Sequence, residues 1–230
     1  MESTTQDDGQ ASCRLLALPP ELRNNIFELV LTVQPDSGDA VTISHASRLD
    51  PPAPSVLAIL QTCRQVRDEA QTVFYHANHL RCYYHNLGLV GIGNMTQFNF
   101  LGSISPTRRA AIRAMTVIVS DGVEAKRAVK VMQRLPGLRS LCLKVMCCNG
   151  DERYYDTILT EETALIEALT GVEGLEELRL DAWERYRTSS KGIGLMLAGL
   201  ERRLQGLLQR RRLDGSRDDG KENRARFGTE

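Results

Sequence analysis

The sequence predicts an α/β protein in which N-terminal helices are followed by an irregular βα layer with a partly parallel sheet. One observation is that apolar residues of the first third recur at helical spacing. A second is that the spacing L-x-x-L-x-L occurs three times after residue 108, with helical patterns between the copies. Strands that are separated by helices pair in parallel, because the chain has to return before each new strand begins.

The composition is that of an ordinary globular protein. Hydrophobic residues make up 42% of the 230 residues and charged residues 25%, which is enough apolar material for a core. Lysine and arginine (29) balance aspartate and glutamate (29), so no overall field attracts the chain to nucleic acid or an anionic membrane. No apolar run is long enough to span a bilayer, and the polar start MESTTQDDGQ has no features of a secretion signal. We therefore expect a cytoplasmic or nuclear protein without structural disulfides.

Shifts in composition divide the chain into four parts. We expect a disordered tail over residues 1–13, a helical region over 14–82, a βα repeat-like region over 83–212 and a disordered charged tail over 213–230. Within the helical region, the Pro, Gly, Ser and Asp residues of 34–54 predict a long loop with a brief strand at Val41–Ile43.

The first helix is predicted to begin at Pro20, which suits a first helical turn. Its apolar residues fall on one stripe of the helix: Leu22, Ile26, Leu29 and Val30. Polar residues such as Arg23 are expected to face away from this stripe. A short amphipathic helix of this kind needs a surface against its apolar stripe, either a partner or the rest of the chain.

A second helix is predicted after the proline cluster, with Ser55 as its cap. Steps of four and three residues place five apolar side chains along its buried seam: Ile59, Cys63, Val66, Ala70 and Val73. We expect this helix to end in a turn at Ala77-Asn78, followed by a short strand rich in tyrosine.

The repeated L-x-x-L-x-L spacing predicts three further strands. Its members are Ile112, Met115 and Val117, then Leu138, Leu141 and Leu143, and last Leu175, Leu178 and Leu180. The segments DGVEAKRAVKVMQRL and TEETALIEAL between them have helical patterns. A final helix is expected to bury one face, formed by Ile193, Leu197, Leu200, Leu204 and Leu207.

No catalytic signature is present, and we expect neither a catalytic centre nor a cofactor. His76, His79, Cys82 and His85 are zinc-ligand types at a spacing of three. Residues three apart on a strand point to opposite faces, so we expect no metal site. The alternative is an enzyme whose site combines His76, His79 and Cys82 with distant acids, and a bound metal would indicate it.

Basic residues gather near the C-terminus: Arg202, Arg203, Arg210, Arg211 and Arg212. Such a cluster is typical of a solvated helix face, or of a contact with acidic protein, RNA or an import receptor. We interpret it as a solvated face and expect neither a nucleic-acid nor a membrane partner. Lys221-Glu222-Asn223 also resembles a KEN degradation signal.

Two blocks of the sequence resemble a known family. LALPPELRNNIFELVL is similar to the opening of an F-box, and ILQTCRQVRDEAQTVFYHANHLRC is similar to the helix that follows it in fungal F-box-like proteins of unknown function. Those proteins join L-P-x-E-L-R-x-x-I-[FY] to T-C-R-Q-[IV]-x-x-E-[AS]-x-x-x-[FY]-[FY]-x-x-N. The two blocks run from Leu16 to about Cys82. The later repeats loosely resemble leucine-rich repeats, with Ser120, Met146 and Trp183 at the usual asparagine position.

The resemblance implies a protein-interaction adaptor that recruits a client to a cullin–RING ubiquitin ligase. In an F-box the matching residues dock on the Skp adaptor, which here implies Leu18, Pro19, Leu22, Ile26 and Leu29. The βα layer would present strand-side residues to a protein client, and we expect Arg139, Lys144, Glu177 and Arg179 among them. The alternative is a scaffold or interaction protein unrelated to ubiquitin, whose apolar stripe packs internally against Ile59, Cys63 and Val66.

Overall fold

The strands of the protein lie side by side in the order in which they occur along the chain. The computed structural model describes residues 14–33, 41–43, 58–84, 100–146, 160–182 and 197–210. Its strands are β1 (Val41–Ile43), β2 (His79–Tyr83), β3 (Ala114–Val119), β4 (Ser140–Val145) and β5 (Glu177–Ala182), and every adjacent pair is parallel. The predicted α/β class and βα layer are confirmed, and the sheet is parallel throughout rather than in part.

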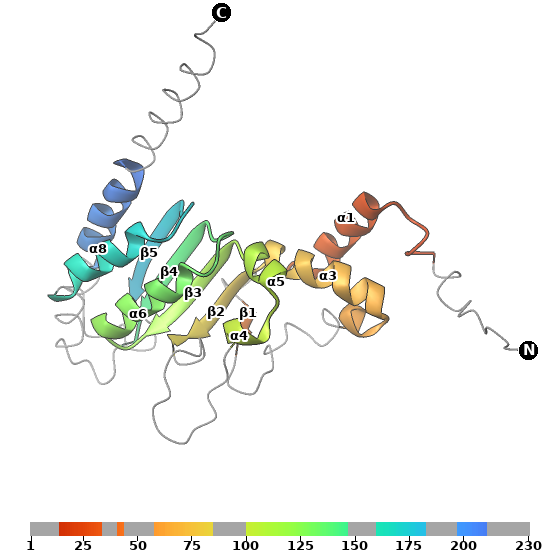
Figure 1. Cartoon of the computed structure of the whole chain (residues 1–230), viewed down its shortest axis with the longest axis horizontal. Coiled ribbons are helices and arrows are strands. Elements are labelled where there is room, and N and C mark those ends of the chain that lie inside the picture. The colour runs from red at the N-terminus through yellow and green to blue at the C-terminus, as the bar shows by residue number, and fades with distance from the viewer. Residues whose placement is uncertain are drawn as a thin grey trace, which may run out of the picture.

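Helices alternate with these strands. The chain runs through α1 (Pro20–Leu31), β1, η1 (Ile59–Gln61), α3 (Arg64–Ala77), β2, α4 (Phe100–Ser103), α5 (Pro106–Ala111), β3, α6 (Gly122–Met132), β4, α8 (Glu162–Thr170), β5 and a helix over 197–210. Crossovers between adjacent parallel strands are right-handed, so a sheet built in chain order carries its helices on one face. Figure 1 shows α5, α6 and α8 along the same side of the strands. No helix of the described ranges is long and apolar enough to cross a membrane.

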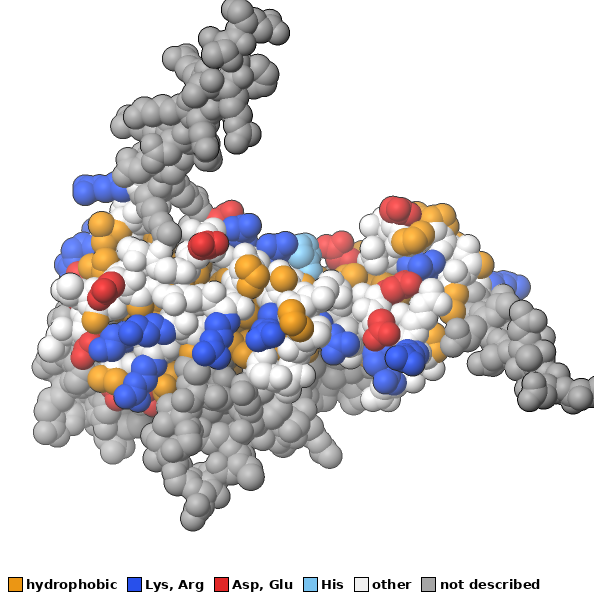
Figure 2. Space-filling view, viewed as in Figure 1, with side chains coloured by type: hydrophobic (Ala, Val, Ile, Leu, Met, Phe, Trp, Pro, Cys, Tyr) orange, Lys and Arg blue, Asp and Glu red, His pale blue; other side chains and the backbone are white. Residues whose placement is uncertain are grey.

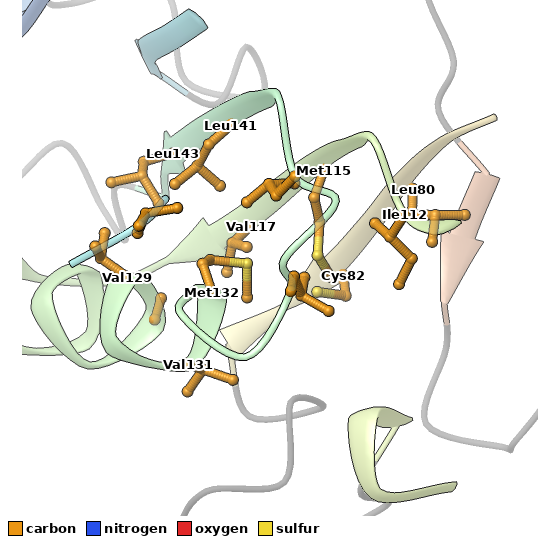
Figure 3. Close-up of a cluster of buried hydrophobic side chains, with 14 of the residues drawn as sticks. Leu80, Cys82, Ile112, Met115, Val117, Val129, Val131, Met132, Leu141 and Leu143 are labelled. Atoms are coloured by element: carbon orange, nitrogen blue, oxygen red, sulfur yellow. The ribbon is translucent and has the colours of Figure 1, made fainter. Parts of the chain in front are cut away.

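The core lies between this row of helices and one face of the sheet. Alternate strand residues are buried there together with helix residues, which in β3, β4 and α6 are Met115, Val117, Leu141, Leu143, Val129 and Met132 (Figure 3). The intervening strand residues, such as Cys142 and Arg179, lie outside this cluster. We call the face that carries these intervening residues the outer sheet face.

Two arginines join successive repeats. Arg113 Nη1 donates to the carbonyl oxygen of Gly137 at 2.9 Å, and Arg139 Nη1 donates to that of Gly174 at 2.8 Å. Each arginine follows the first apolar residue of one repeat and reaches the glycine that precedes the first apolar residue of the next. The main-chain oxygen of Arg113 also accepts from Ser140 N at 2.9 Å. These bonds keep neighbouring repeats in the same register.

The C-terminal helix covers the edge of the last strand. Glu201 Oε2 accepts from Leu180 N at 2.8 Å, and Gln205 Nε2 donates to the carbonyl oxygen of Leu178. Both backbone groups belong to β5, and an unpaired strand edge is a template for association with another chain. The helix therefore supplies the hydrogen-bond partners that a sixth strand would otherwise provide.

Most of the predicted elements are confirmed within the described residues. The brief strand at Val41–Ile43, the turn at Ala77-Asn78 and the three strands of the L-x-x-L-x-L repeats are present. The first member of each repeat, Ile112, Leu138 or Leu175, is buried just before its strand begins. Residues 1–13 and 213–230 lie outside the described residues. The division into regions 14–82 and 83–212 stays a prediction, and the sheet takes strands from both ranges.

Two predicted helices differ from the structure. The second helix begins at Arg64, because Cys63 has an extended backbone and its Sγ accepts from Val66 N at 3.5 Å, which caps α3 and separates it from η1. The predicted cap Ser55 lies outside the described residues, as does Ile193 of the last helix. In that helix Leu208 is buried and Leu207 is exposed, so the predicted face was wrong by one residue at its C-terminal end.

Two glycine substitutions test the packing between repeats. A Cβ atom at Gly137 would lie 2.0 Å from the main-chain oxygen of Ala110, whereas one at Gly206 in the last helix meets nothing within 4 Å. We expect Gly137→Ala to destabilise the protein by roughly 1–3 kcal/mol through overpacking. Gly206→Ala should stabilise it by about 0.5–1 kcal/mol through helix propensity. Urea unfolding measures both, and shifts of the same sign would contradict this account.

Candidate functional site

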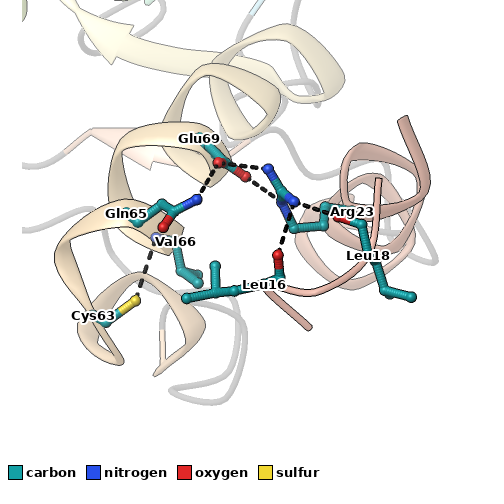
Figure 4. Close-up of polar contacts among 7 residues, drawn as sticks. All are labelled: Leu16, Leu18, Arg23, Cys63, Gln65, Val66 and Glu69. Atoms are coloured by element: carbon teal, nitrogen blue, oxygen red, sulfur yellow. Dashed lines mark hydrogen bonds and ion pairs between the residues drawn. The ribbon is translucent and has the colours of Figure 1, made fainter. Parts of the chain in front are cut away.

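The first helix is held against α3 by a buried arginine. Arg23 Nε lies 2.7 Å from Glu69 Oε2, and Arg23 Nη2 donates to Glu69 Oε1 at 2.9 Å. The remaining terminal nitrogen, Nη1, donates to the carbonyl oxygens of Leu16 and Leu18 (Figure 4). The guanidinium therefore joins the start of α1 to the middle of α3, and a two-point pair of this kind fixes orientation as well as distance.

The environment of this pair keeps both groups charged. The hydrogen bonds from Arg23 hold the pKa of Glu69 below its ordinary value, against the opposing effect of desolvation. A further bond from Gln65 Nε2 to Glu69 Oε1, at 3.1 Å, acts in the same direction. The bond to Glu69 in turn raises the pKa of Arg23. A buried charge is tolerated here because every part of it that leaves water finds a partner.

A second polar residue ties the other end of α1. The buried side chain of Asn78 donates from Nδ2 to the carbonyl oxygens of Leu31 and Phe74, both at 2.9 Å, and its Oδ1 accepts from Val33 N at 2.8 Å. One amide thus satisfies the last turns of α1 and α3 together. With Arg23 at one end and Asn78 at the other, α1 cannot rotate about its axis without breaking these bonds.

These ties determine which residues of α1 reach solvent. Arg23, Phe27 and Leu31 face α3 and are buried. At 3.6 residues per turn, Leu22 and Leu29 then point away from α3, with exposed fractions of 50% and 83%. Arg23 thus faces away from the apolar stripe, as predicted, but it lies on the packed side of the helix, because the pairing with Glu69 allows a charge to occupy the inner face.

The five residues expected to dock on an adaptor lie on or beside this outer side. Pro19, Leu22 and Leu29 are exposed, and Leu18 and Ile26 are half-buried. Phe27 and Leu31 of α1 belong to the core cluster together with Val66, whereas Leu22, Ile26 and Leu29 neither belong to it nor are among the partly buried residues packed against it. Five large hydrophobic residues are exposed in the described ranges, and three of them belong to α1: Leu22, Leu29 and Val30. We call Leu22, Ile26, Leu29 and Val30 the outer stripe.

The outer sheet face is a second candidate surface. Its central row pairs Arg81 with Thr116, Cys142 and Arg179 across the strands, and the flanking rows end at Glu177 and Asp181 on β5. Of the four residues expected to meet a client, Lys144, Glu177 and Arg179 belong to this face. The fourth, Arg139, precedes β4 and is engaged in the turn between repeats.

Polar contacts order the outer sheet face. Lys144 Nζ lies 3.6 Å from Asp181 Oδ2, and Arg179 Nε donates to Glu177 Oε1 at 2.8 Å. The bond from Ser140 Oγ to Glu177 Oε2, at 2.8 Å, is the main cause that lowers the pKa of Glu177, and Arg179 adds to it. The face therefore carries charges of both signs whose positions are fixed by these contacts.

The described residues of the hypothetical metal or enzyme site do not form a cluster. His79 lies on the outer sheet face, where its Nε2 is 2.7 Å from Thr116 Oγ1, whereas Cys82 lies in the core on the opposite face. Full burial raises the pKa of the Cys82 thiol, which opposes formation of a thiolate. His76 lies on α3, and His85 is outside the described residues. Within the described ranges no three His, Cys, Asp or Glu residues are grouped to hold a metal.

Comparison with known proteins adds no relative. No protein-family model, no curated protein and no solved structure matches the chain.

The polar residues that position the outer stripe were not predicted from the sequence. Arg23, Glu69 and Asn78 occupy fixed positions of the two blocks on which the F-box-like resemblance rests, the R, the E and the final N. The structure brings all three to the boundary between α1 and α3. The sequence did contain a signal for this pairing, since the first block has a fixed arginine and the second a fixed glutamate, each on a predicted helix.

Removal of one carboxylate tests this arrangement through its pH dependence. The lowered pKa of Glu69 implies that its contribution to stability is fully present above the ordinary glutamate pKa of about 4.3 and is lost as the pH falls through the lowered value. Glu69→Gln should therefore be less stable than wild type at neutral pH, and the difference should vanish in acid. The measurement is thermal unfolding over a pH series. Glu167→Gln, at an exposed position of α8, is the control and should show no such difference.

Proposed function

We propose that the protein is an interaction adaptor that docks through the outer stripe of α1 and receives a client on the outer sheet face. The observation that carries this proposal is the exposure of Leu22 and Leu29 on a helix whose inner contacts are already complete. Exposed apolar residues that gather on one helix are typical of a surface that a groove on another protein covers. Binding, with no bond-making step, is the proposed mechanism.

The proposed docking partner is the Skp adaptor of a cullin–RING ubiquitin ligase. Support comes from the F-box-like resemblance, because it assigns that contact to Leu18, Pro19, Leu22, Ile26 and Leu29. All five are exposed or half-buried, and they lie on α1 or immediately before it. Further support comes from the polar ties, which hold the stripe outward in the free protein. A stripe that is already in place at binding avoids the cost of ordering it.

The proposed client surface is the outer sheet face, because the helices cover only the other face of the sheet. A parallel sheet in strict chain order with helices on a single face has the architecture of a solenoid, and we propose that it is a short, leucine-rich-repeat-like array. Arrays of this kind use the face without helices for binding. Lys144, Glu177 and Arg179 then contribute to client recognition, and Arg139 acts indirectly by holding the turn before β5.

A docking assay with two double variants tests the proposal. The double variant Leu22→Arg, Leu29→Arg should bind a Skp adaptor with an affinity at least about 100-fold lower in a co-purification titration, because it replaces two apolar anchors by charges. Both positions are exposed, so the variant should remain folded. Asn24→Arg with Glu28→Gln adds the same two units of charge to the other flank of α1 and should bind as wild type does.

A well-folded wild-type protein that does not bind the Skp adaptor would contradict the ligase part of the proposal. The protein would then be a scaffold that uses the same outer stripe for a partner unconnected to ubiquitin. Equal loss of binding in the two double variants would contradict the assignment of the contact to the stripe.

A further inference from the structure

Positive charge is concentrated in one part of a chain that is neutral overall. Residues 100–139 contain eight lysines and arginines and only two acids, Asp121 and Glu124, so this segment carries a net charge of +6. The segment supplies α5, β3, α6 and the turn that leads to β4. The balance of 29 basic against 29 acidic residues therefore hides a strong local excess.

The fold places these charges on the helical side of the layer. In α6 the side that faces the sheet consists of small and apolar residues: Gly122, Ala125, Ala128, Val129, Val131 and Met132. At 3.6 residues per turn the solvent side then carries Lys126, Arg127 and Lys130, and Arg134 follows one turn further on. Arg108 and Arg109 extend the charge along α5. Figure 2 shows Lys and Arg side chains in a band across this side of the molecule.

Ion pairs within the described residues engage three of the eight basic residues of this segment, and one of the three is Arg139, whose Nε lies 3.9 Å from Glu176 Oε1. Lys126 Nζ pairs with Glu161 at 2.6 Å, but Arg108 Nη2 is 3.9 Å from the nearest oxygen of Asp68. The carboxylates of the two acids in the segment accept hydrogen bonds from main-chain N–H groups. Asp121 Oδ1 accepts from Glu124 N and Glu124 Oε2 accepts from Ser120 N, both at 2.7 Å. Arg113 donates to the carbonyl oxygen of Gly137, and the other four basic residues of the segment form no ion pair within the described part of the chain: Arg109, Arg127, Lys130 and Arg134. We call these four the basic face.

The side chains around the basic face indicate which class of partner it can bind. Val123 is the one large hydrophobic residue of α6 that is exposed, and no aromatic residue is among the exposed large hydrophobics of the described ranges. A protein interface needs a buried apolar or aromatic centre, membrane insertion needs an apolar face, and single-stranded nucleic acid needs aromatic residues for stacking. The phosphates of a nucleic-acid duplex are bound by positively charged side chains alone, and arginine is well suited to bind phosphate.

We infer that the basic face binds the phosphate backbone of a nucleic-acid duplex without regard to sequence. The inference is independent of the proposed adaptor function, because the outer stripe and the outer sheet face contribute nothing to it. Four phosphate contacts predict a slope of about −3.6 for the logarithm of affinity against that of salt concentration, or about a 100-fold loss between 50 and 200 mM salt.

Fluorescence anisotropy with a labelled DNA duplex of about 20 base pairs tests the inference on the full chain. Wild type should bind two unrelated sequences equally and with the salt dependence given above. Lys130→Glu with Arg134→Glu should weaken binding by at least about 10-fold and flatten the salt slope. Arg64→Glu with Arg202→Glu makes the same change in net charge at exposed positions on α3 and the last helix, and it should retain wild-type binding.

Three outcomes would overturn the inference. They are no duplex binding by wild type at low salt, equal loss in the two double variants, and tighter binding to vesicles that contain phosphatidylserine than to the duplex. Thermal unfolding of each variant establishes that it is folded, so that a loss of binding reports the surface charge alone.

Discussion

The ion pair between Arg23 and Glu69 determines which side of α1 faces solvent, and the proposed docking function depends on it. A lone charge between two helices would be strongly unfavourable, but here the guanidinium meets a carboxylate and two main-chain oxygens. At the other end of α1, the buried side chain of Asn78 is likewise satisfied by hydrogen bonds with main-chain groups. Because both ties are directional, they fix the rotation of α1 more tightly than apolar packing alone would, and the outer stripe stays exposed as a result.

The order of the strands separates the surfaces of the molecule. Since β1 to β5 follow one another in sequence, the helices collect on one face of the sheet, and the other face carries the intervening strand side chains, of which Thr116 and Ile118 in β3 are buried. The two arginines between repeats hold the register, and the last helix covers the edge at β5. The outer stripe, the outer sheet face and the basic face are therefore formed by different parts of the molecule, so the contacts that we propose for them do not exclude one another.

Residue patterns predicted the strands better than the site. The L-x-x-L-x-L spacing locates β3, β4 and β5, because alternate burial on a pleated strand allows little variation. The rotation of α1 was left open between a partner and the chain's own core, because a hydrophobicity pattern does not reveal that Arg23 pairs with Glu69, which lies 46 positions away. The start of α3 was missed because cysteine is an uncommon cap. The basic face was missed because the overall charge is balanced, and only the fold shows that the cations share a surface.

The central claim is that the free protein holds the outer stripe toward solvent. Methyl-labelled leucines in the presence of a soluble paramagnetic agent test it most directly by NMR, since the agent broadens signals only where solvent reaches. The account predicts strong broadening of the Leu22 and Leu29 methyl signals and a protected Leu31 signal on the same helix. Signals of Leu22 and Leu29 as protected as that of Leu31 would contradict it, because the stripe would then be packed inside the protein.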